Sequence, residues 1–171
     1  MTQIFSFPPI SRPDAQVLIL GSMPGVMSLS LQQYYSHPQN AFWRIVGEIL
    51  GFDATLGYAQ RTTALVERKV ALWDVLEACV REGSLDSAID NSSIVPNDFA
   101  GFFARHPGIR RVCFNGATAE SVYRRKVFPT WAPSHPVGYF PLPSSSPAHA
   151  GMPFAAKVQA WRVIQAGDVN H

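Results

Sequence analysis

The chain has 171 residues and a mass of 18.8 kDa, and 47% of its residues are hydrophobic while 15% are charged. This length and composition indicate a globular domain with a sizeable core, and they exclude a disordered or fibrous protein. The 14 Lys and Arg against 12 Asp and Glu give a net charge of +2. That charge excludes a protein that holds nucleic acid by bulk charge alone, but it allows a local basic patch.

The cysteines and the amino-terminal residues bear on the cellular compartment. Cys79 and Cys113 are the only cysteines. Two thiols at this separation cannot build a cysteine-rich zinc site or an iron–sulfur cluster, and they indicate a reducing, cytosolic environment. Residues 1–12 lack a basic start followed by an apolar signal core, and no apolar run approaches the roughly 20 residues that span a bilayer. We therefore expect a soluble, cytoplasmic protein.

The hydrophobic pattern predicts strands that alternate with helices. Residues 17–21 form a wholly apolar run ended by glycine, which is typical of a buried parallel strand, and apolar residues then recur at helical spacing from Asn40 to Gly51. The later segments predicted are strands at 70–74, 111–116 and 139–142, and helices at 96–105, 117–126 and about 153–166. This order indicates a three-layer α/β fold with a mainly parallel sheet, and we expect a single domain over residues 1–171.

Two long stretches contain no charged residue, namely residues 15–43 and 127–156. Two neutral loops packed on the domain would explain them. A site for a neutral, flat ligand would also explain them, because such a site gains more from aromatic walls, amides and hydroxyls than from charge. Ligands bind at the carboxyl ends of parallel strands, and each stretch supplies one such end, at residues 21–25 and 143–146. The sequence therefore predicts a site at this edge of the sheet.

Six of the 14 basic residues lie in one span, residues 105–126, that contains a single acidic residue, Glu120. The span holds Arg105, Arg110, Arg111, Arg124, Arg125 and Lys126. A solvated helix face is one interpretation, and a rim that contacts phosphates is the other.

Four segments stand out as ordered sequence motifs. The first is Gly-Ser-Met-Pro-Gly at 21–25 with Tyr-Tyr-Ser-His-Pro-Gln-Asn-Ala-Phe-Trp at 34–43. The others follow in order at 72–76 with 83–87, at 114–119 and at 142–148. Together they resemble the motifs of the uracil-DNA glycosylase superfamily, and in particular its hypoxanthine-DNA (deoxyinosine) glycosylase branch. The resemblance implies an α/β/α sandwich with a four-stranded, mainly parallel sheet, excision of a damaged base from DNA, and no metal or cofactor.

The resemblance implies that Asn40 is the catalytic residue. An amide at the start of a helix can orient a water molecule without competing as a nucleophile, although Asn40 would also serve as a plain N-cap. Tyr35 matches the aromatic residue on which the flipped base stacks, and the alternative is a core tyrosine. His37 either positions the loop or contacts the substrate. Phe42 and Trp43 are expected to pack in the core.

Four further positions are expected to line the base pocket, and one of them, Met23, departs from the superfamily. Met23 stands where other members carry Asn or Asp to activate water, so a thioether here shifts that task to Asn40 and argues against strong uracil activity. Backbone amides from Ser22 onward are candidates for contacts to the base. Asp74 is expected to accept the N1–H of hypoxanthine and to repel adenine, or else to cap a following helix. Asn115 is a candidate for the pocket rim or for loop support.

The last motif is expected to contact DNA through Ser144, Ser145, Ser146, Pro147 and His149. In the superfamily this loop presses serines against phosphates and enters the minor groove, which kinks the duplex and lowers the cost of base flipping. His149 stands where the branch carries Asn, which leaves its role open. The four motifs contain no lysine, so a Schiff-base lyase step is not expected.

These observations predict a monofunctional DNA glycosylase that uses water to release hypoxanthine. Its partner is DNA with a deaminated base, with no membrane contact, and we expect a monomer. The alternatives are a uracil or xanthine glycosylase of the same superfamily, or a non-catalytic α/β module that binds nucleotides or DNA. A small-molecule hydrolase is disfavoured because Gly-x-Ser-x-Gly is absent.

Overall fold

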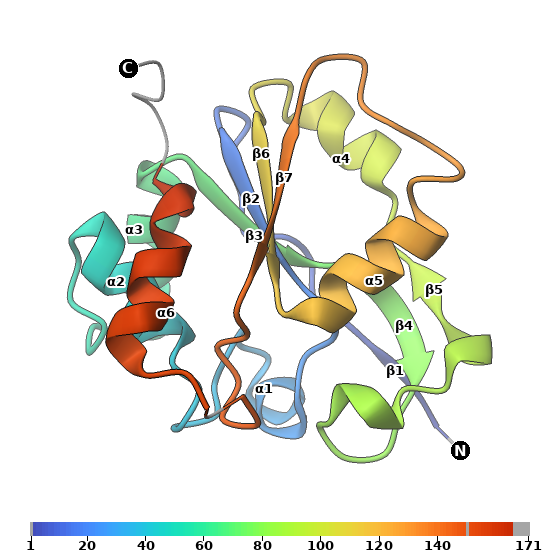
Figure 1. Cartoon of the computed structure of the whole chain (residues 1–171), viewed down its shortest axis with the longest axis horizontal. Helices are drawn as coiled ribbons and strands as arrows, with labels where there is room; N and C mark the ends of the chain where they lie inside the picture. Colours follow the sequence, from blue (N-terminus) through green and yellow to red (C-terminus); the bar gives the residue numbers. More distant parts are fainter. Residues whose placement is uncertain (1, 150, 166–171) are drawn as a thin grey trace.

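A four-stranded parallel sheet lies at the centre of the molecule (Figure 1). The computed structural model describes residues 2–149 and 151–165. In spatial order the strands are β3 (Val70–Asp74), β2 (Val17–Gly21), β6 (Arg111–Asn115) and β7 (Gly138–Leu142). Each neighbouring pair runs parallel. The predicted α/β class with a four-stranded, mainly parallel sheet is therefore confirmed.

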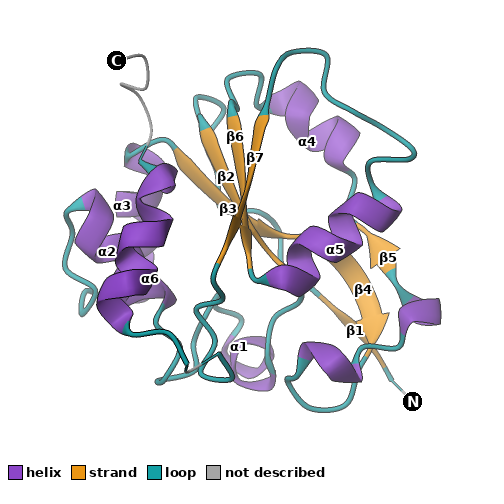
Figure 2. Ribbon diagram, viewed as in Figure 1, coloured by secondary structure: helices purple, strands orange, loops and turns teal. Residues whose placement is uncertain are grey.

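Helices cover both faces of this sheet and complete the three layers (Figure 2). One face carries α2 (Phe42–Leu50), α3 (Tyr58–Glu67) and α6 (Phe154–Trp161), and the other carries α4 (Phe99–Arg105) and α5 (Ala117–Lys126). Because side chains alternate along a strand, Leu18 and Leu20 join the core on the α4–α5 side, whereas Val17 and Ile19 join the core on the α2–α6 side. Both faces are apolar, as expected for a parallel sheet buried on both sides.

A small antiparallel sheet, which the sequence did not reveal, packs beside the main one. It contains β1 (Gln3–Phe5), β4 (Leu76–Val80) and β5 (Val95–Pro96), in the order β1-β4-β5. Each sheet contains one buried, free cysteine, Cys79 in β4 and Cys113 in β6.

The predicted elements of the main layer occur close to their expected positions. Strands β2 and β3 have the predicted bounds, α5 has the predicted bounds, and β7 lies at the sheet edge that its prolines favour. The helix predicted from Pro96 begins at Phe99 instead, because the Asp98 side chain accepts the Gly101 N–H and caps it there. The last helix ends at Trp161 and continues as a 3₁₀ turn to Ile164, and Ala166 lies outside the described residues.

The sheet register brings the carboxyl ends of the strands together. Gly21 pairs with Asp74 at one junction, and Asn115 pairs with Leu142 at another. The loops that leave these ends, together with the short helix α1 (Val26–Leu31), gather at the bottom of the view in Figure 1. None of the described helices is long and apolar enough to cross a membrane.

Candidate active site

A pocket of about 740 Å³ opens at the carboxyl ends of the four parallel strands. All of the site residues selected from the sequence line it: Ser22, Met23, Tyr35, Asn40, Asp74, Asn115, Ser144, Ser145, Ser146, Pro147 and His149. The two uncharged stretches thus meet in one cavity, as expected. Within the described part of the chain, the lining includes the carboxyl groups of Asp74 and Asp86 but no lysine or arginine.

The floor of the pocket depends on the absence of a side chain at Gly21. A Cβ at this position would lie 2.6 Å from Asp74 Oδ1 and 2.6 Å from Tyr35 OH, so only glycine lets both groups approach the end of β2. Tyr35 OH and Asp74 Oδ2 are both buried without a hydrogen-bond partner. The floor therefore presents a phenol oxygen and a carboxyl oxygen that lack an internal hydrogen-bond partner.

Tyr35 reaches the floor through an uncommon backbone conformation. Its φ of 54° is left-handed, which is rare for a residue with a bulky side chain. The ring stacks on Phe42 with a centroid separation of 4.1 Å and an interplanar angle of 16°. Tyr35 thus both packs against the core and lines the pocket, while Phe42 and Trp43 are buried as expected.

The Asp74 carboxyl group lies in surroundings that strongly raise its pKa. Asp74 is only 2% exposed, and burial first, then the negative charge of Asp86, raise its pKa to about 7 against the opposing effect of Arg81. The capping alternative for Asp74 is wrong, because strand β4 and not a helix follows it. We expected Asp74 only to accept hydrogen bonds at neutral pH. With a pKa of about 7, the carboxyl group is instead partly ionised and partly neutral near that pH, and the neutral form can also donate.

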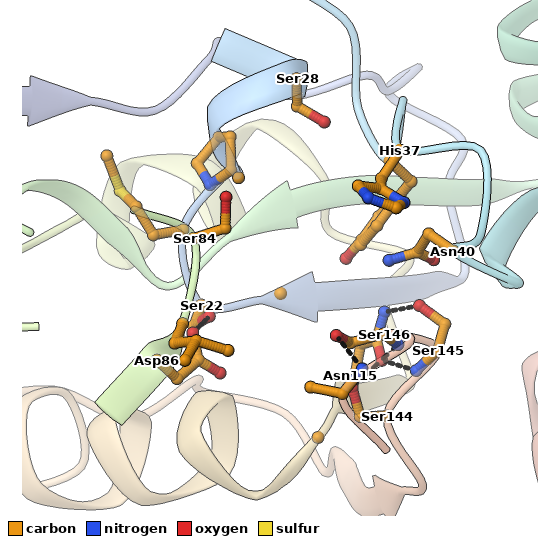
Figure 3. Close-up of a pocket in the computed structure, with 18 of the residues that line it drawn as sticks. Ser22, Ser28, His37, Asn40, Ser84, Asp86, Asn115, Ser144, Ser145 and Ser146 are labelled. Atoms are coloured by element: carbon orange, nitrogen blue, oxygen red, sulfur yellow. Dashed lines mark hydrogen bonds between the residues drawn. The ribbon is translucent and has the colours of Figure 1, made fainter. Parts of the chain in front are cut away.

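Asn40 lies on the pocket rim beside the start of α2 (Figure 3). Its Oδ1 accepts the Phe42 N–H at 2.9 Å, but the N-cap residue of α2 is Ala41, so the alternative that Asn40 is a plain N-cap is wrong. An amide oxygen has two lone pairs and the nitrogen two hydrogens, which leaves one acceptor and two donors of Asn40 for a ligand. The hydrogen bond to Phe42 and contact with a substrate are therefore compatible at this residue. His37 is exposed on the same rim, and its Nδ1 accepts the Gln39 N–H.

One side of the pocket, the serine wall, consists of residues 144–149 with Asn40 and Asn115. Ser145 is 1% exposed and exchanges two hydrogen bonds with Asn115, each of 2.9 Å, while its carbonyl accepts the Ala41 N–H. Asn115 therefore supports the loop, and Ser145 joins that loop to the start of α2.

The remaining groups of the serine wall lie nearer to solvent. Ser144 Oγ accepts the Ser146 N–H, and Ser146 Oγ accepts the Ala148 N–H, so each hydroxyl keeps its own hydrogen to donate. Helix α6 fixes the loop from behind, because Lys157 Nζ donates to the His149 carbonyl at 2.8 Å and Trp161 Nε1 donates to the Pro143 carbonyl at 2.8 Å.

The opposite side, the arginine wall, consists of residues 22–26 and 83–86 with Arg81. Ser22 Oγ donates to Asp86 Oδ1 at 2.6 Å, and the Val26 N–H donates to Ser84 Oγ at 2.9 Å. Figure 3 shows Ser22, Ser84 and Asp86 across the pocket from Ser144, Ser145 and Ser146.

Behind this wall lies a buried guanidinium group that sequence reasoning missed. Arg81 is 6% exposed; its Nε donates to the Gly83 carbonyl at 2.8 Å and its Nη2 to the Pro24 carbonyl at 2.6 Å. The sequence signal that could have found it is that Arg81 lies two residues before the segment already selected at 83–87.

The basic cluster does not form a rim around this pocket. Arg110 and Arg111 lie at the start of β6, at the opposite end of the sheet, and Arg111 donates to the Val163 and Gln165 carbonyls. Arg124 pairs with Glu120 at 3.0 Å on the α5 surface. Arg125 lines a smaller cavity, of about 320 Å³, next to the main pocket.

The family model of the uracil DNA glycosylase superfamily matches residues 8–165 of the chain. The chain belongs to the uracil DNA glycosylase superfamily. The predicted membership is thus confirmed, and with it the enzyme class of DNA glycosylases.

Two curated relatives and one solved structure agree with this membership. A hypoxanthine DNA glycosylase from Methanosarcina barkeri is 42% identical over 64% of this chain and 69% of its own length. One from Methanosarcina acetivorans is 38% identical over 72% of this chain and 83% of its own. The solution NMR structure of a candidate uracil DNA glycosylase from Methanosarcina acetivorans superposes with a TM-score of 0.74 at 32% identity, covering 96% of this chain and all of that one.

The side chains of this superfamily member do not gather as metal ligands in the part of the chain that the structure describes. There, no three His, Cys, Asp or Glu residues are placed to hold a metal ion. The described pocket lining consists of amides, hydroxyls, carboxyls, aromatic rings and apolar side chains.

Proposed function

We propose that the protein is a monofunctional DNA glycosylase that hydrolyses the N-glycosidic bond of a flipped deaminated base, hypoxanthine above all. The observation that carries this proposal is the floor of the pocket, where a buried carboxyl and a stacked tyrosine meet over Gly21. The volume of about 740 Å³ suits a nucleotide. Two relatives named hypoxanthine DNA glycosylase, at 42% and 38% identity, support the choice of base.

The proposed role of Asp74 is to accept the N1–H of hypoxanthine at the pocket floor. Either form of the carboxyl group has an oxygen that accepts this hydrogen bond. The neutral form adds an advantage, because the base leaves with negative charge and an ionised neighbour would oppose that charge. A pKa of about 7 keeps much of Asp74 neutral at physiological pH. Tyr35 is proposed to stack on the base, while Ser22 and Met23 form the pocket side next to it.

The proposed nucleophile is a water molecule held by Asn40. The free lone pair of Oδ1 accepts one hydrogen of that water, which aims an oxygen lone pair at the sugar carbon as positive charge develops there. The thioether of Met23, which is 7% exposed, offers no competing group for this task. Because the described pocket lining contains no lysine, the proposal includes no Schiff-base step.

DNA contacts are proposed for the outer part of the serine wall. The hydroxyls of Ser144 and Ser146 keep a hydrogen to donate to phosphate oxygens, and Pro147 and His149 lie exposed at the tip of the loop. The buried Ser145 contributes by holding the loop in place. We also propose that the chain acts as a monomer and a single domain in a reducing compartment such as the cytoplasm, in keeping with its two buried free thiols.

The test is base release from duplexes that carry one hypoxanthine, uracil or xanthine. We expect hypoxanthine to be released fastest, and we expect Asn40→Ala to slow single-turnover release by about 10²–10⁴-fold because the water loses its orienting group. Gln39→Ala is the matched control, since it removes a neighbouring amide that does not line the pocket.

The other outcomes separate the alternatives. Faster release of uracil or xanthine would keep the glycosylase and change its substrate. Binding of the duplex with no release of any base would favour a non-catalytic module. Equal losses in Asn40→Ala and Gln39→Ala would remove Asn40 from the catalytic role.

A further inference from the structure

The described lining of the main pocket contains no lysine or arginine, although the proposed substrate is a polyanion. Neutralisation of phosphates by basic side chains supplies most of the sequence-independent affinity of proteins for DNA. With a net charge of +2, the chain has little positive charge to spread over its surface. A basic side chain placed next to the pocket would therefore have a large influence on how DNA is held.

Arg125, from the basic cluster at 105–126, occupies such a place. It lines the smaller cavity of about 320 Å³, here called the side cavity, which is formed by Asp86, Ser87, Ile89, Asn91, Ala117, Thr118, Ser121, Val122 and Arg125. Residues 86–87 and 117–118 also line the main pocket, so the two cavities adjoin. Because Figure 3 shows Asp86 across the pocket from Ser144, Ser145 and Ser146, the side cavity extends from the side opposite the serine wall.

Helix α5, which begins just after the carboxyl end of β6, presents the polar groups of the side cavity on one face (Figure 1). Thr118, Ser121 and Arg125 are separated by three and four residues, so they form one stripe along the helix. Arg125 Nε donates to Ser121 Oγ at 3.3 Å, so the guanidinium group lies back along the helix toward the main pocket. Seven helical residues span about 10 Å, which is the distance over which this stripe leads away from the main pocket.

The groups in the side cavity suit an anion. Arg125 uses its Nε for Ser121, which leaves its two terminal nitrogens as donors for a ligand. The Ser121 hydroxyl accepts that bond and keeps its own hydrogen to donate, and Thr118 adds a second hydroxyl. The carboxylate in this cavity, Asp86, accepts the Ser22 hydroxyl, and the charge of buried Arg81 opposes its own. The free donors therefore outnumber the free acceptors.

We propose that the side cavity binds a phosphodiester group of the damaged strand, a few nucleotides from the flipped base, through Arg125, Ser121 and Thr118. This inference rests on the proposed glycosylase function and adds a charged phosphate site to it. A strand whose nucleotide enters the main pocket continues on both sides of the opening. The serine wall is proposed to hold one side, and the side cavity then holds the other. Successive phosphates of one strand lie about 3.4 Å apart along the duplex axis, so about 10 Å corresponds to about three nucleotides.

The experiment compares Arg125→Gln with Arg124→Gln on a hypoxanthine-containing oligonucleotide, as a duplex and as a single strand. Arg124 is the matched control because it is the adjacent arginine of α5, pairs with Glu120 and lines neither cavity. We expect Arg125→Gln to raise KM roughly fivefold on both substrates, the size of a single exposed ion pair. The single-turnover rate at saturation should not change, because a distant phosphate is held equally in the ground and transition states.

The Kd is measured on the 2′-fluoro analogue of the substrate, in which the electron-withdrawing fluorine opposes positive charge on the sugar and slows release. The slope of log Kd against log salt should become shallower by about one unit in Arg125→Gln and should be restored in Arg125→Lys. Single phosphates of the damaged strand are then replaced by neutral methylphosphonates. At one position, about three nucleotides from hypoxanthine, the replacement should raise the Kd of the wild type and of Arg124→Gln but not that of Arg125→Gln, which has already lost this contact.

The other outcomes overturn the proposal. Equal effects of Arg124→Gln and Arg125→Gln would show that Arg125 contributes only general charge. A rise in Kd confined to the duplex, or coupling of Arg125 to a phosphate of the complementary strand, would show that the damaged strand does not enter the side cavity. In each of these cases base release by the wild type leaves the glycosylase function standing. If instead no base is released while Arg125 remains coupled to one phosphate of the damaged strand, the proposed function fails and the side cavity stands as a DNA site.

Discussion

The serine wall and the arginine wall face each other across one pocket, yet they are held by different interactions. On the pocket side, the serine wall is fixed by neutral groups, since Asn115 and Ser145 exchange two hydrogen bonds, and Lys157 holds the His149 carbonyl from behind. The arginine wall is fixed by charged groups, with buried Arg81 reaching two carbonyls and Asp86 accepting from Ser22. Neutral bonds are insensitive to pH, whereas the charges of the arginine wall act on any titratable group nearby.

The difference also separates two tasks. The serine wall carries the small hydroxyls that we propose to contact the phosphate backbone, and its groups are not among the causes that shift the pKa of Asp74. The arginine wall sets the ionisation of Asp74, because Asp86 raises and Arg81 lowers its pKa. The Asp74 carboxyl group of the floor is therefore electrostatically coupled to the arginine wall. Substitutions that break one wall at a time can test this division.

The largest effect on the unfolding free energy is expected from the ionisation of Asp74 as the pH rises. Its pKa is about 7 in the folded protein and near 3.8 in an unfolded chain, so the folded state holds the proton more tightly. The contribution of the Asp74 proton to the unfolding free energy is fully present below about pH 4. It falls as the pH rises toward 7 and is lost above that pH. Relative to Asp74→Asn, the wild type should lose on the order of 4 kcal/mol of unfolding free energy across this window.

Urea denaturation of both proteins from pH 4 to pH 8 measures this loss. Base release adds a second measurement: the wild-type rate should fall above pH 7 as Asp74 ionises beside the leaving base, while the rate of Asp74→Asn should show no such fall. Parallel stability curves for the two proteins would show that Asp74 does not titrate in this range.

The second largest effect on the unfolding free energy is expected from removal of the Arg81 guanidinium group in the arginine wall. Arg81→Met removes the donors to the Pro24 and Gly83 carbonyls, and we expect the unfolding free energy to drop by about 3 kcal/mol. The same change removes the positive charge that lowers the pKa of Asp74, so the fall in rate should move to higher pH. Arg81→Lys keeps the charge and should leave that fall in place. A loss of stability without any move in the pH profile would contradict the coupling.

The smallest effect is expected on the serine wall. Asn115→Ala breaks both hydrogen bonds to Ser145, and we expect a loss of about 1–2 kcal/mol in unfolding free energy. Duplex release should slow because residues 144–149 lose their fixed position, but the pH at which the rate falls should not move. Asn115→Asp retains the acceptor for the Ser145 N–H and should be less affected. A shifted pH profile in Asn115→Ala would show that both walls act on Asp74.

The main sheet and its helices were predictable because each depends on a local pattern. The apolar runs at 17–21 and 70–74 and the glycines that end elements mark buried strands and helix ends without reference to the rest of the chain. The small antiparallel sheet was not predictable in this way. Strand β4 follows β3 after a single residue, Val75, and no turn signal separates the two in the sequence.

The candidate site also has a part that the sequence predicts and a part that only the folded structure reveals. The serine wall and Asn40 belong to motifs that can be read directly, and the structure brings those motifs into one pocket. The arginine wall depends on pairs far apart in sequence, such as Ser22 with Asp86 and Arg81 with Pro24. The raised pKa of Asp74 likewise follows from burial, which is a property of the assembled fold. No local sequence pattern predicts these long-range contacts.

The two buried cysteines give the molecule a built-in pair of conformational reporters. Cys113 lies at the centre of the parallel sheet and Cys79 in the small antiparallel sheet, and burial raises the pKa of both thiols, that of Cys113 to about 12. In the folded protein both thiols are buried and un-ionised, so neither reacts readily with an alkylating reagent. The labelling rate of each therefore measures how often its own sheet opens, so the two sheets can be followed separately in the unmodified protein.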